Sequence, residues 1–175
     1  MEKKTKRLLL RIFLLGIMAI LIFYSVYQNL NDDQKNALAT KGENATNFTG
    51  ETILGEKIEL TKTGTEKTLI NFWGSWCEPC IREMPALESA YSKYNNFALI
   101  SVNVGESKLV IDQFINRYNL SFPVISDRDS SIRQAYHVGN LPVTFLVDSE
   151  GIIEEVHEGE LTEEMLNDWM NISVK

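Results

Sequence analysis

Cysteine is scarce in this 175-residue sequence: Cys77 and Cys80 are the only two, and two residues separate them. This small number excludes a disulfide framework and a four-cysteine zinc site. Histidine is equally scarce, and His137 and His157 do not have the spacing of metal ligands. The sequence also lacks a glycine-rich phosphate loop, an internal repeat and a low-complexity segment. We therefore expect one globular domain with a modest extension and without a metal, flavin or nucleotide cofactor.

Positive charge is limited too, because the net charge of the chain is −7. A surface for binding nucleic acid is therefore not expected. The charge is divided unevenly: residues 1–30 contain five basic residues and one acidic residue, whereas the other 145 residues carry a net charge of −11. The sequence thus consists of a basic N-terminal piece and an acidic remainder.

A membrane anchor is predicted at residues 8–27, an apolar stretch that follows the basic tail 1–7 and is interrupted only by Arg11. A helix of this length spans about 30 Å, the thickness of the hydrocarbon core. Because the cations precede the stretch, we expect a cytoplasmic N-terminus and an extracytoplasmic remainder. A cleaved signal peptide is the alternative, with its nearest small-x-small site at residues 37–39.

The rest of the chain is predicted to be a linker at residues 28–46, which are polar, and a domain at residues 47–175. In the domain, short apolar runs alternate with amphipathic helical patterns, which predicts an α/β fold with a central mixed sheet flanked by helices on both faces. The expected elements are a hairpin at 53–60, strands at 68–73, 97–104 and 122–125, helices at 77–94, 109–118 and 130–136, a second hairpin formed by 143–147 and 152–156, and a final helix at 161–172.

The run Trp76-Cys77-Glu78-Pro79-Cys80 joins the end of a predicted buried strand to the start of a helix. At a helix N-terminus the free N–H groups and the helix dipole favour a thiolate on the first cysteine. The two cysteines are one turn apart, with Cα atoms at roughly 5–6 Å, which a disulfide tolerates. Pro79 fits the first turn because its missing N–H leaves no helical bond unmade. A structural disulfide closing so short a loop would contribute little stability, so the pair predicts a redox-active couple.

These residues carry a resemblance to the thioredoxin-like fold and, more narrowly, to the membrane-anchored thiol-disulfide oxidoreductases of the TlpA/ResA group. The similarity extends through residues 103–107 (NVGES), 122–124 (FPV) and 141–147 (LPVTFLV), and the N-terminal anchor fits it as well. It implies a thioredoxin-like fold over about residues 48–172, with an N-terminal β-hairpin and a central insertion, preceded by one transmembrane helix. It also implies a single-pass protein in the cell membrane of a Gram-positive bacterium.

The resemblance implies a protein-disulfide reductase as well. The ResA members of the group reduce the disulfide of apocytochrome c before haem attachment, and a transmembrane dithiol carrier of the CcdA type supplies their electrons. In such a reaction Cys77 attacks the substrate disulfide, and Cys80 resolves the mixed disulfide. The alternatives are a reductase for another extracytoplasmic target such as spore-envelope proteins, a thiol peroxidase and a copper-binding chaperone. Peroxidases use a cysteine in a threonine-containing loop, and the chaperone would need wider cysteine spacing and a ligand histidine.

Further site residues are assigned by the same resemblance. Pro142, after Leu141, stands at the place of a cis-proline that faces the cysteines and leaves the preceding backbone free to pair with a substrate chain. Glu83 stands where the family has an acidic residue that tunes the cysteines and recognises substrate, and a carboxylate there could move protons. The alternative for Glu83 is a solvated helix charge. Glu78 is expected to adjust the redox potential, and Trp76, beside the nucleophile, to form a wall of the cleft.

Overall fold

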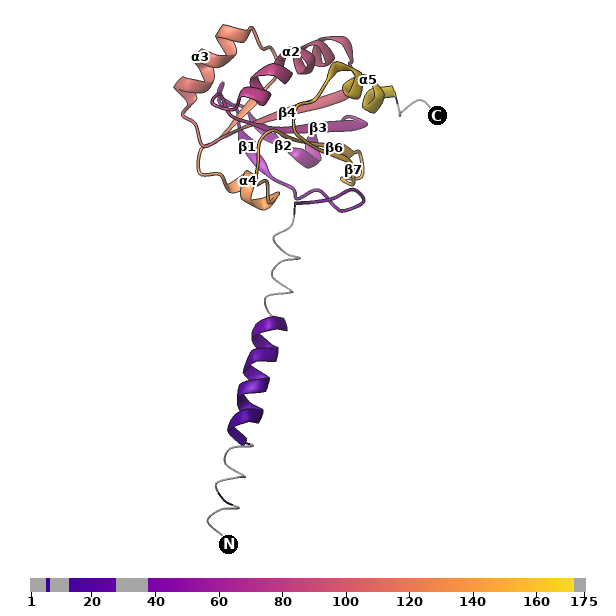
Figure 1. Ribbon diagram of the computed structural model, residues 1–175. Helices are drawn as coiled ribbons and strands as arrows, with labels where there is room; N and C mark the ends of the chain where they lie inside the picture. Colours follow the sequence, from indigo (N-terminus) through magenta and orange to yellow (C-terminus); the bar gives the residue numbers. More distant parts are fainter. Residues whose placement is uncertain (1–5, 7–12, 28–37, 172–175) are drawn as a thin grey trace. The chain divides into compact units, whose positions relative to one another are not determined.

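The computed structural model describes residue 6, residues 13–27 and residues 38–171. The chain divides into two compact units, residues 1–37 and residues 38–175. In the first unit, residues 13–27 form a helix (Figure 1). The apolar side chains of this helix are exposed. Within the described ranges, no helix combines the length and the apolar character needed to cross a membrane. Residues 8–12 of the predicted span lie outside those ranges.

The second unit is built around a five-stranded mixed sheet with the strand order β5-β4-β3-β6-β7. The central strand β3 is parallel to β4, and β4 to β5, whereas β6 is antiparallel to both β3 and β7. This arrangement confirms the mixed sheet predicted from the alternation of apolar runs and helices. The strands are β3 (Lys67–Trp73), β4 (Phe97–Val104), β5 (Val124–Asp127), β6 (Val143–Asp148) and β7 (Ile153–Glu158).

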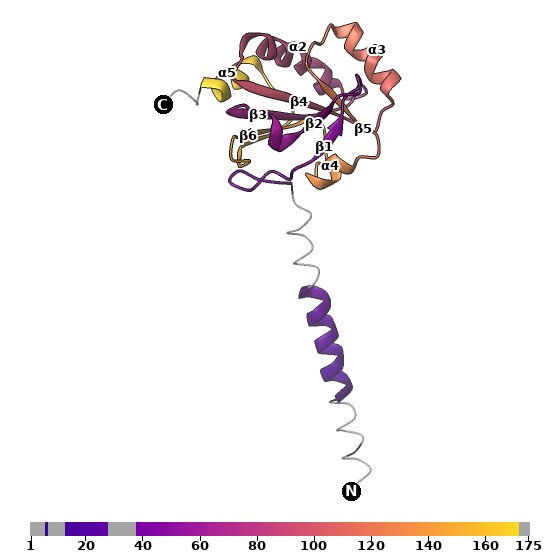
Figure 2. The same ribbon diagram turned by 180° about the vertical axis from the view of Figure 1, so that it is seen from behind.

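Helices cover both faces of this sheet (Figures 1 and 2). Along β3, Leu69 and Trp73 belong to the core on one face, whereas Ile70 and Phe72 belong to the core on the other, because successive side chains of a strand alternate. The first face is covered by α2 (Glu78–Lys93), α3 (Lys108–Tyr118) and α5 (Glu163–Asn171). The second is covered by α4 (Ser131–Ala135), the hairpin of β1 (Thr49–Glu51) and β2 (Lys57–Glu59), and the 3-10 turn η1 (Leu60–Lys62).

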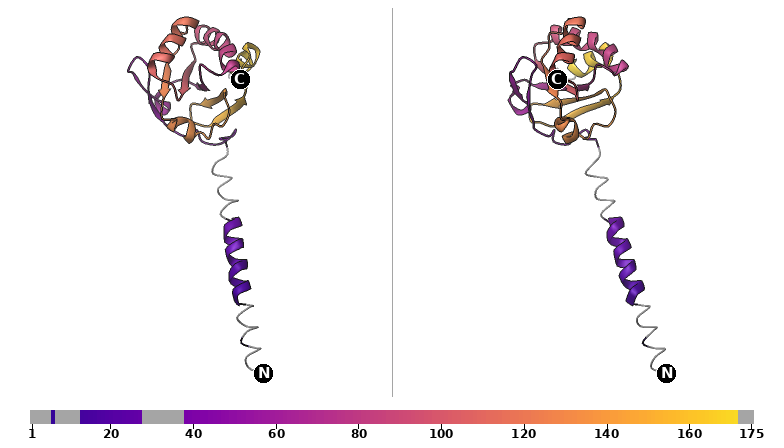
Figure 3. Two further views of the ribbon diagram at one scale, coloured as in Figure 1. Left: turned by 60° about the vertical axis from the view of Figure 1, so that its left-hand side comes forward. Right: turned by 90° about the vertical axis from the view of Figure 1, so that its left-hand side faces the viewer.

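The helix ends follow local capping signals. Cys77 is the N-cap of α2, and Ser107 accepts a hydrogen bond from Val110 N–H at the start of α3. Before α5, Met165 N–H donates to Thr162 Oγ1 at 3.2 Å, so the Thr162 side chain caps the start of this helix. Figure 3 shows the sheet and its helices from two further sides. The chain leaves β3 at Trp73 and enters α2 at Glu78, so a short loop connects the central strand to the first helix on the first face.

Three differences from the sequence-based prediction bear on the fold, and several other element ends differ by one or two residues. The predicted linker 28–46 reaches too far, because Gly42 N–H donates to Ile153 O and Tyr136 donates to Thr46 O, so residues 38–46 belong to the domain; residues 28–37 lie outside the described part. The first hairpin begins at residue 49 and not at residue 53, so the start of the predicted hairpin at 53–60 falls in the turn between the two strands. β5 extends to Asp127 because pairing with β4 continues past the last apolar residue.

Candidate active site

Cys77 and Cys80 form a disulfide with a Cα–Cα separation of 5.2 Å. Cys77 is the N-cap of α2, and its Sγ accepts a hydrogen bond from Cys80 N–H at 3.4 Å. Cys77 is 6% exposed and Cys80 is fully buried, so Cys77 is the one of the two that retains some exposed surface. Pro79 lies in the first turn of α2, where its missing N–H costs no helical hydrogen bond. The pair therefore has a slightly exposed cysteine at the helix N-terminus and a completely buried one in the first turn of the helix.

Two site residues predicted from the sequence lie on the surface beside this pair. Trp76 is 65% exposed although it is a large aromatic residue, and Glu78 is exposed as well. Glu78 forms a 3.6 Å ion pair with Arg82, whose guanidinium also contacts Glu160 at 2.7 Å. An exposed tryptophan beside a reactive sulfur offers apolar area to a bound partner, since such residues dominate many interfaces.

Glu83 is completely buried, one turn beyond Cys80 on α2. Its Oε1 accepts a 2.8 Å hydrogen bond from Asn71 Nδ2, and its Oε2 accepts a 2.9 Å hydrogen bond from the backbone N–H of Leu161. Burial raises the pKa of the Glu83 carboxyl to about 7, although both hydrogen bonds lower it. The burial argues against a solvated helix charge. A carboxyl group with this pKa exchanges its proton at neutral pH.

Asn71 and the backbone of Leu161 are site components that the sequence analysis missed. Asn71 lies in the middle of β3 and pairs in register with Thr144 of β6, to whose Oγ1 its Nδ2 also donates at 3.0 Å. A buried asparagine inside an apolar strand run, between Ile70 and Phe72, was the only available signal. The hydrogen bond from Asn71 to Glu83 could not be read from the sequence, because this contact depends on how α2 crosses the sheet.

The Leu141–Pro142 peptide bond is cis, as the resemblance implied. Pro142 is buried at the start of β6, and its carbonyl oxygen accepts a 2.9 Å hydrogen bond from Gly159 N–H. Leu141 packs against the hydrophobic cluster that contains both cysteines. The loop after β7 thus holds two parts of the site, since Gly159 binds Pro142 and Leu161 binds Glu83.

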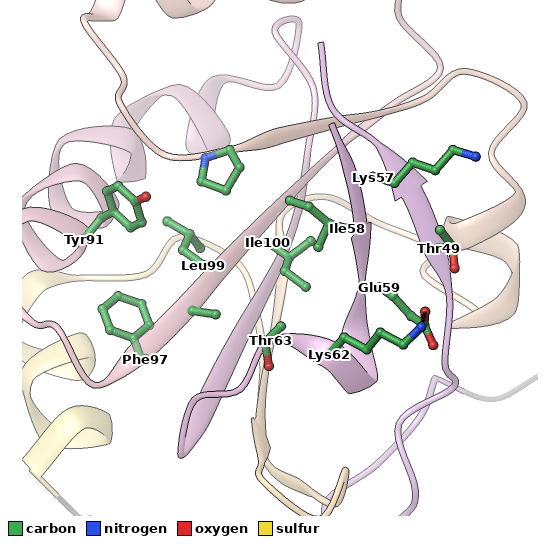
Figure 4. Close-up of a pocket in the computed structure, with 12 residues that line it drawn as sticks. Thr49, Lys57, Ile58, Glu59, Lys62, Thr63, Tyr91, Phe97, Leu99 and Ile100 are labelled. Atoms are coloured by element: carbon green, nitrogen blue, oxygen red, sulfur yellow. Dashed lines mark ion pairs between the residues drawn. The ribbon is translucent and has the colours of Figure 1, made fainter. Parts of the chain in front are cut away.

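The structure brings most of the predicted site residues into one region: the two cysteines and Leu141 share a cluster, and Glu83 is on the cysteines' helix. A hollow in the surface lies elsewhere on the domain. A groove of about 660 Å³ is bordered by the first hairpin and the N-terminal half of β4, including Lys57, Ile58, Leu99 and Ile100 (Figure 4). Neither cysteine lines this groove. The redox chemistry requires the cysteines, so the active site is assigned to the disulfide and not to the groove.

Comparisons with known proteins agree with this site. The model of the AhpC/TSA family matches residues 41–156. Thiol-disulfide oxidoreductase ResA of Halalkalibacterium halodurans is 37% identical over 171 residues, which cover 97% of this chain and 96% of that protein. ResA of Bacillus subtilis is 36% identical over 172 residues, which cover 97% of this chain and 95% of that protein.

Among solved structures, StoA from Bacillus subtilis matches with a TM-score of 0.65 and 33% identity, over 71% of this chain and 96% of that one. The match extends over the thioredoxin-like sheet with its flanking helices, and in this chain the disulfide lies at the start of α2. The chain therefore belongs to the AhpC/TSA family, within which it is a thiol-disulfide oxidoreductase of the ResA group.

Proposed function

We propose that this enzyme reduces the disulfide of apocytochrome c before covalent haem attachment, on the extracytoplasmic face of the cell membrane. One arrangement carries the proposal: a disulfide at the N-terminus of α2 stands one turn from the buried Glu83, whose carboxyl pKa is raised by burial. The nearly full-length similarity to proteins named ResA supports the same chemistry. A reductase needs an attacking cysteine nearer to solvent and a protected second cysteine, and the 6% exposed Cys77 and the fully buried Cys80 fit these two roles.

The reaction starts from the reduced dithiol. The Cys77 thiolate attacks one sulfur of the substrate disulfide and forms a mixed disulfide, while the other substrate sulfur leaves as a thiolate. Cys80, as a thiolate, then attacks Cys77 Sγ and releases the second substrate sulfur. Two electrons have passed to the substrate, and the enzyme is left with the Cys77–Cys80 disulfide that the structure contains.

Glu83 is proposed to take the proton of the Cys80 thiol in the second step. A buried thiol becomes nucleophilic only when it loses its proton, and α2 places Glu83 one turn away from Cys80. Because the carboxyl pKa is about 7, a large fraction of Glu83 is ionised and can accept a proton at neutral pH. The Asn71 amide and the Leu161 N–H hold this carboxylate in place while it is charged.

We further propose that residues 8–27 anchor the protein in the membrane, with residues 1–7 in the cytoplasm. The five basic residues before Ile12 favour that orientation. The oxidised enzyme must receive two electrons before each cycle, and a transmembrane dithiol carrier of the CcdA type is the proposed donor.

The substrate is tested by deleting the gene and measuring covalent haem in c-type cytochromes on a haem-stained gel. We expect the signal to be lost, to return with the full-length chain, and to stay absent with Cys77→Ala. Exogenous dithiothreitol should restore it, because a chemical reductant replaces the missing activity. Normal cytochromes in the deletion strain would contradict the proposal and would favour another extracytoplasmic disulfide, such as one in a spore-envelope protein.

The direction of electron flow is tested separately, by equilibrating the full-length chain with glutathione or dithiothreitol redox buffers. A reductase is expected to have a Cys77–Cys80 potential near or below that of thioredoxin, about −270 mV. A potential near −120 mV, typical of a strong oxidant, would contradict a reducing role.

A further inference from the structure

The turn that leads into the cysteines is fixed by a side chain from another strand end. Ser75, two residues before Cys77, donates its backbone N–H to Glu106 Oε2 at 2.7 Å and its hydroxyl to Glu106 Oε1 at 2.6 Å. Both carboxylate oxygens of Glu106 thus accept hydrogen bonds from Ser75, which lies in the loop between β3 and α2. Glu106 is 31 residues away in sequence and follows the end of β4.

Glu106 is itself held in a fixed position. The buried amide Nδ2 of Asn103 donates to Glu106 Oε2 at 2.7 Å, and Ser126 Oγ donates to the backbone carbonyl of Glu106 at 3.3 Å. Asn103 pairs in register with Trp73, the last residue of β3. The carboxylate therefore connects the ends of two neighbouring strands to the loop, and its position is set by the sheet.

The loop that Glu106 holds determines where Cys77 stands. Cys77 N–H donates to Gly74 O at 3.1 Å, which closes a turn over residues 74–77. The Trp76 ring lies so close to Gly74 that a Cβ placed there would be 2.8 Å from it. A turn this tight has few alternative conformations, so its anchor at Ser75 also fixes the direction of the Cys77 side chain relative to the helix N-terminus.

We propose that Glu106 is a positioning residue for Cys77: by fixing Ser75, its carboxylate holds the attacking sulfur at the N-terminus of α2. Glu106 touches no reacting atom and acts through the Ser75 turn. If the turn relaxes, the thiolate of the reduced enzyme loses part of its alignment with the helix N–H groups and becomes both less stable and less well aimed. The proposal rests on the thiol-disulfide oxidoreductase activity and not on the substrate or the direction of electron flow.

The test compares Glu106→Ala with Glu106→Gln in the full-length chain. A glutamine oxygen can keep the bonds from Ser75 N–H and Asn103 Nδ2, and its NH₂ can donate to Ser75 Oγ, so this variant changes the charge and retains the geometry. In a Cys80→Ala background, which leaves Cys77 as the single thiol, the rate of alkylation by iodoacetamide is measured against pH. This readout follows the Cys77 thiolate and requires no protein substrate.

Glu88 offers a matched control because its carboxylate makes the same pair of contacts elsewhere. Its Oε2 accepts the Ser121 N–H at 2.8 Å, and its Oε1 accepts the Ser121 hydroxyl. Glu88→Ala therefore removes an equivalent anchor between α2 and the segment before β5. Urea unfolding of both alanine variants shows whether they lose similar stability.

We expect Glu106→Gln to stay within about threefold of the parent alkylation rate at pH 7, and Glu106→Ala to fall about tenfold below Glu106→Gln, with the midpoint of its profile at higher pH. Glu88→Ala should keep the parent profile. Coincident profiles for Glu106→Ala and Glu106→Gln, or an equal change in Glu88→Ala, would overturn the proposal. If Glu106→Ala does not fold, Ser75→Ala, which loses only the hydroxyl bond, is expected to slow alkylation about threefold, and an unchanged rate would contradict the proposal.

The experiment is independent of the cytochrome proposal. If gene deletion leaves c-type cytochromes normal, the proposed substrate fails, and the alkylation profiles still report on the role of Glu106. If the profiles coincide while the deletion abolishes haem attachment, the positioning role fails and the proposed function stands.

Discussion

Asn71 Nδ2 donates a 2.8 Å hydrogen bond to Glu83 Oε1 in a part of the core where both side chains are fully buried. The bond connects the middle of the central strand β3 to the active-site helix α2. It stabilises the charged form of a carboxyl group that burial would otherwise keep neutral, and the resulting pKa of Glu83 is about 7. The enzyme thus contains an interior carboxyl group whose pKa is influenced by a residue of the sheet.

Replacement of Glu83 by Gln should remove a pH dependence from the second step of the reaction. In the wild type, resolution of the mixed disulfide by Cys80 is expected to speed up as pH rises through about 7, because Glu83 becomes able to accept the proton. In Glu83→Gln this rise should disappear, and resolution at pH 7.5 should be slower by roughly tenfold or more. Single-turnover release of substrate, measured from pH 5.5 to 8.5, separates this step from the initial attack. An unchanged profile in the variant would show that Glu83 is not the acceptor.

The same substitution should slow the reaction but increase the stability of the fold relative to wild type as pH rises. The pKa of Glu83 is about 7 in the folded chain and near 4.5 in the unfolded chain, so the folded state retains a proton that the unfolded state loses. Stability from this group is fully present below pH 4.5 and is lost as pH rises through 7. Glu83→Gln stays neutral and should therefore gain stability relative to wild type between pH 5 and 8, by roughly 3 kcal/mol at most. Urea unfolding at both pH values gives this difference, and a constant difference would contradict the raised pKa.

Asn71→Ala should raise the pKa of Glu83 further, because it removes a hydrogen bond that favours the carboxylate. The midpoint of the pH profile for resolution is expected to move above that of wild type. Thr144→Val provides the control, since it removes only the second acceptor of the Asn71 amide and keeps the bond to Glu83. If both variants shift the midpoint equally, the effect comes from general loosening of the polar cluster and the specific role of Asn71 is wrong.

The site residues that are close in sequence or that the family resemblance assigned were predictable, whereas the contacts that depend on how distant segments pack were not. Cys77, Cys80 and Glu83 lie on one helix, so their spacing alone places them on neighbouring turns. Asn71 reaches Glu83 only because α2 crosses β3, and the Leu161 N–H comes from 78 residues away.

The errors in the fold have a similar origin. Residues 38–46 look like a linker because their side chains are polar, yet backbone bonds to Gly151 and Ile153 hold them against the domain. β5 continues through Asp127 although this residue is charged. The buried Asp127 carboxylate accepts hydrogen bonds from Ile132 N–H and Arg133 N–H at the start of α4. Polar composition therefore misled the prediction wherever backbone pairing or capping satisfied the polar groups.

Trp76 should contribute to the recognition of protein substrates and little to stability. Its side chain is 65% exposed beside Cys77, so Trp76→Ala removes few buried contacts, and the free energy of unfolding should change by about 0.5 kcal/mol or less. With a protein disulfide the KM is expected to rise about tenfold, because a tryptophan at the centre of an interface often contributes more than 1 kcal/mol to binding. With a small disulfide such as oxidised glutathione the rate should stay near wild type, since the cysteines and the helix N-terminus are unchanged. Trp76→Phe, which keeps an aromatic face, should lose less than the alanine variant. Equal losses with the large and the small disulfide would instead assign Trp76 a role in shaping the cysteine turn, where its ring packs over Gly74.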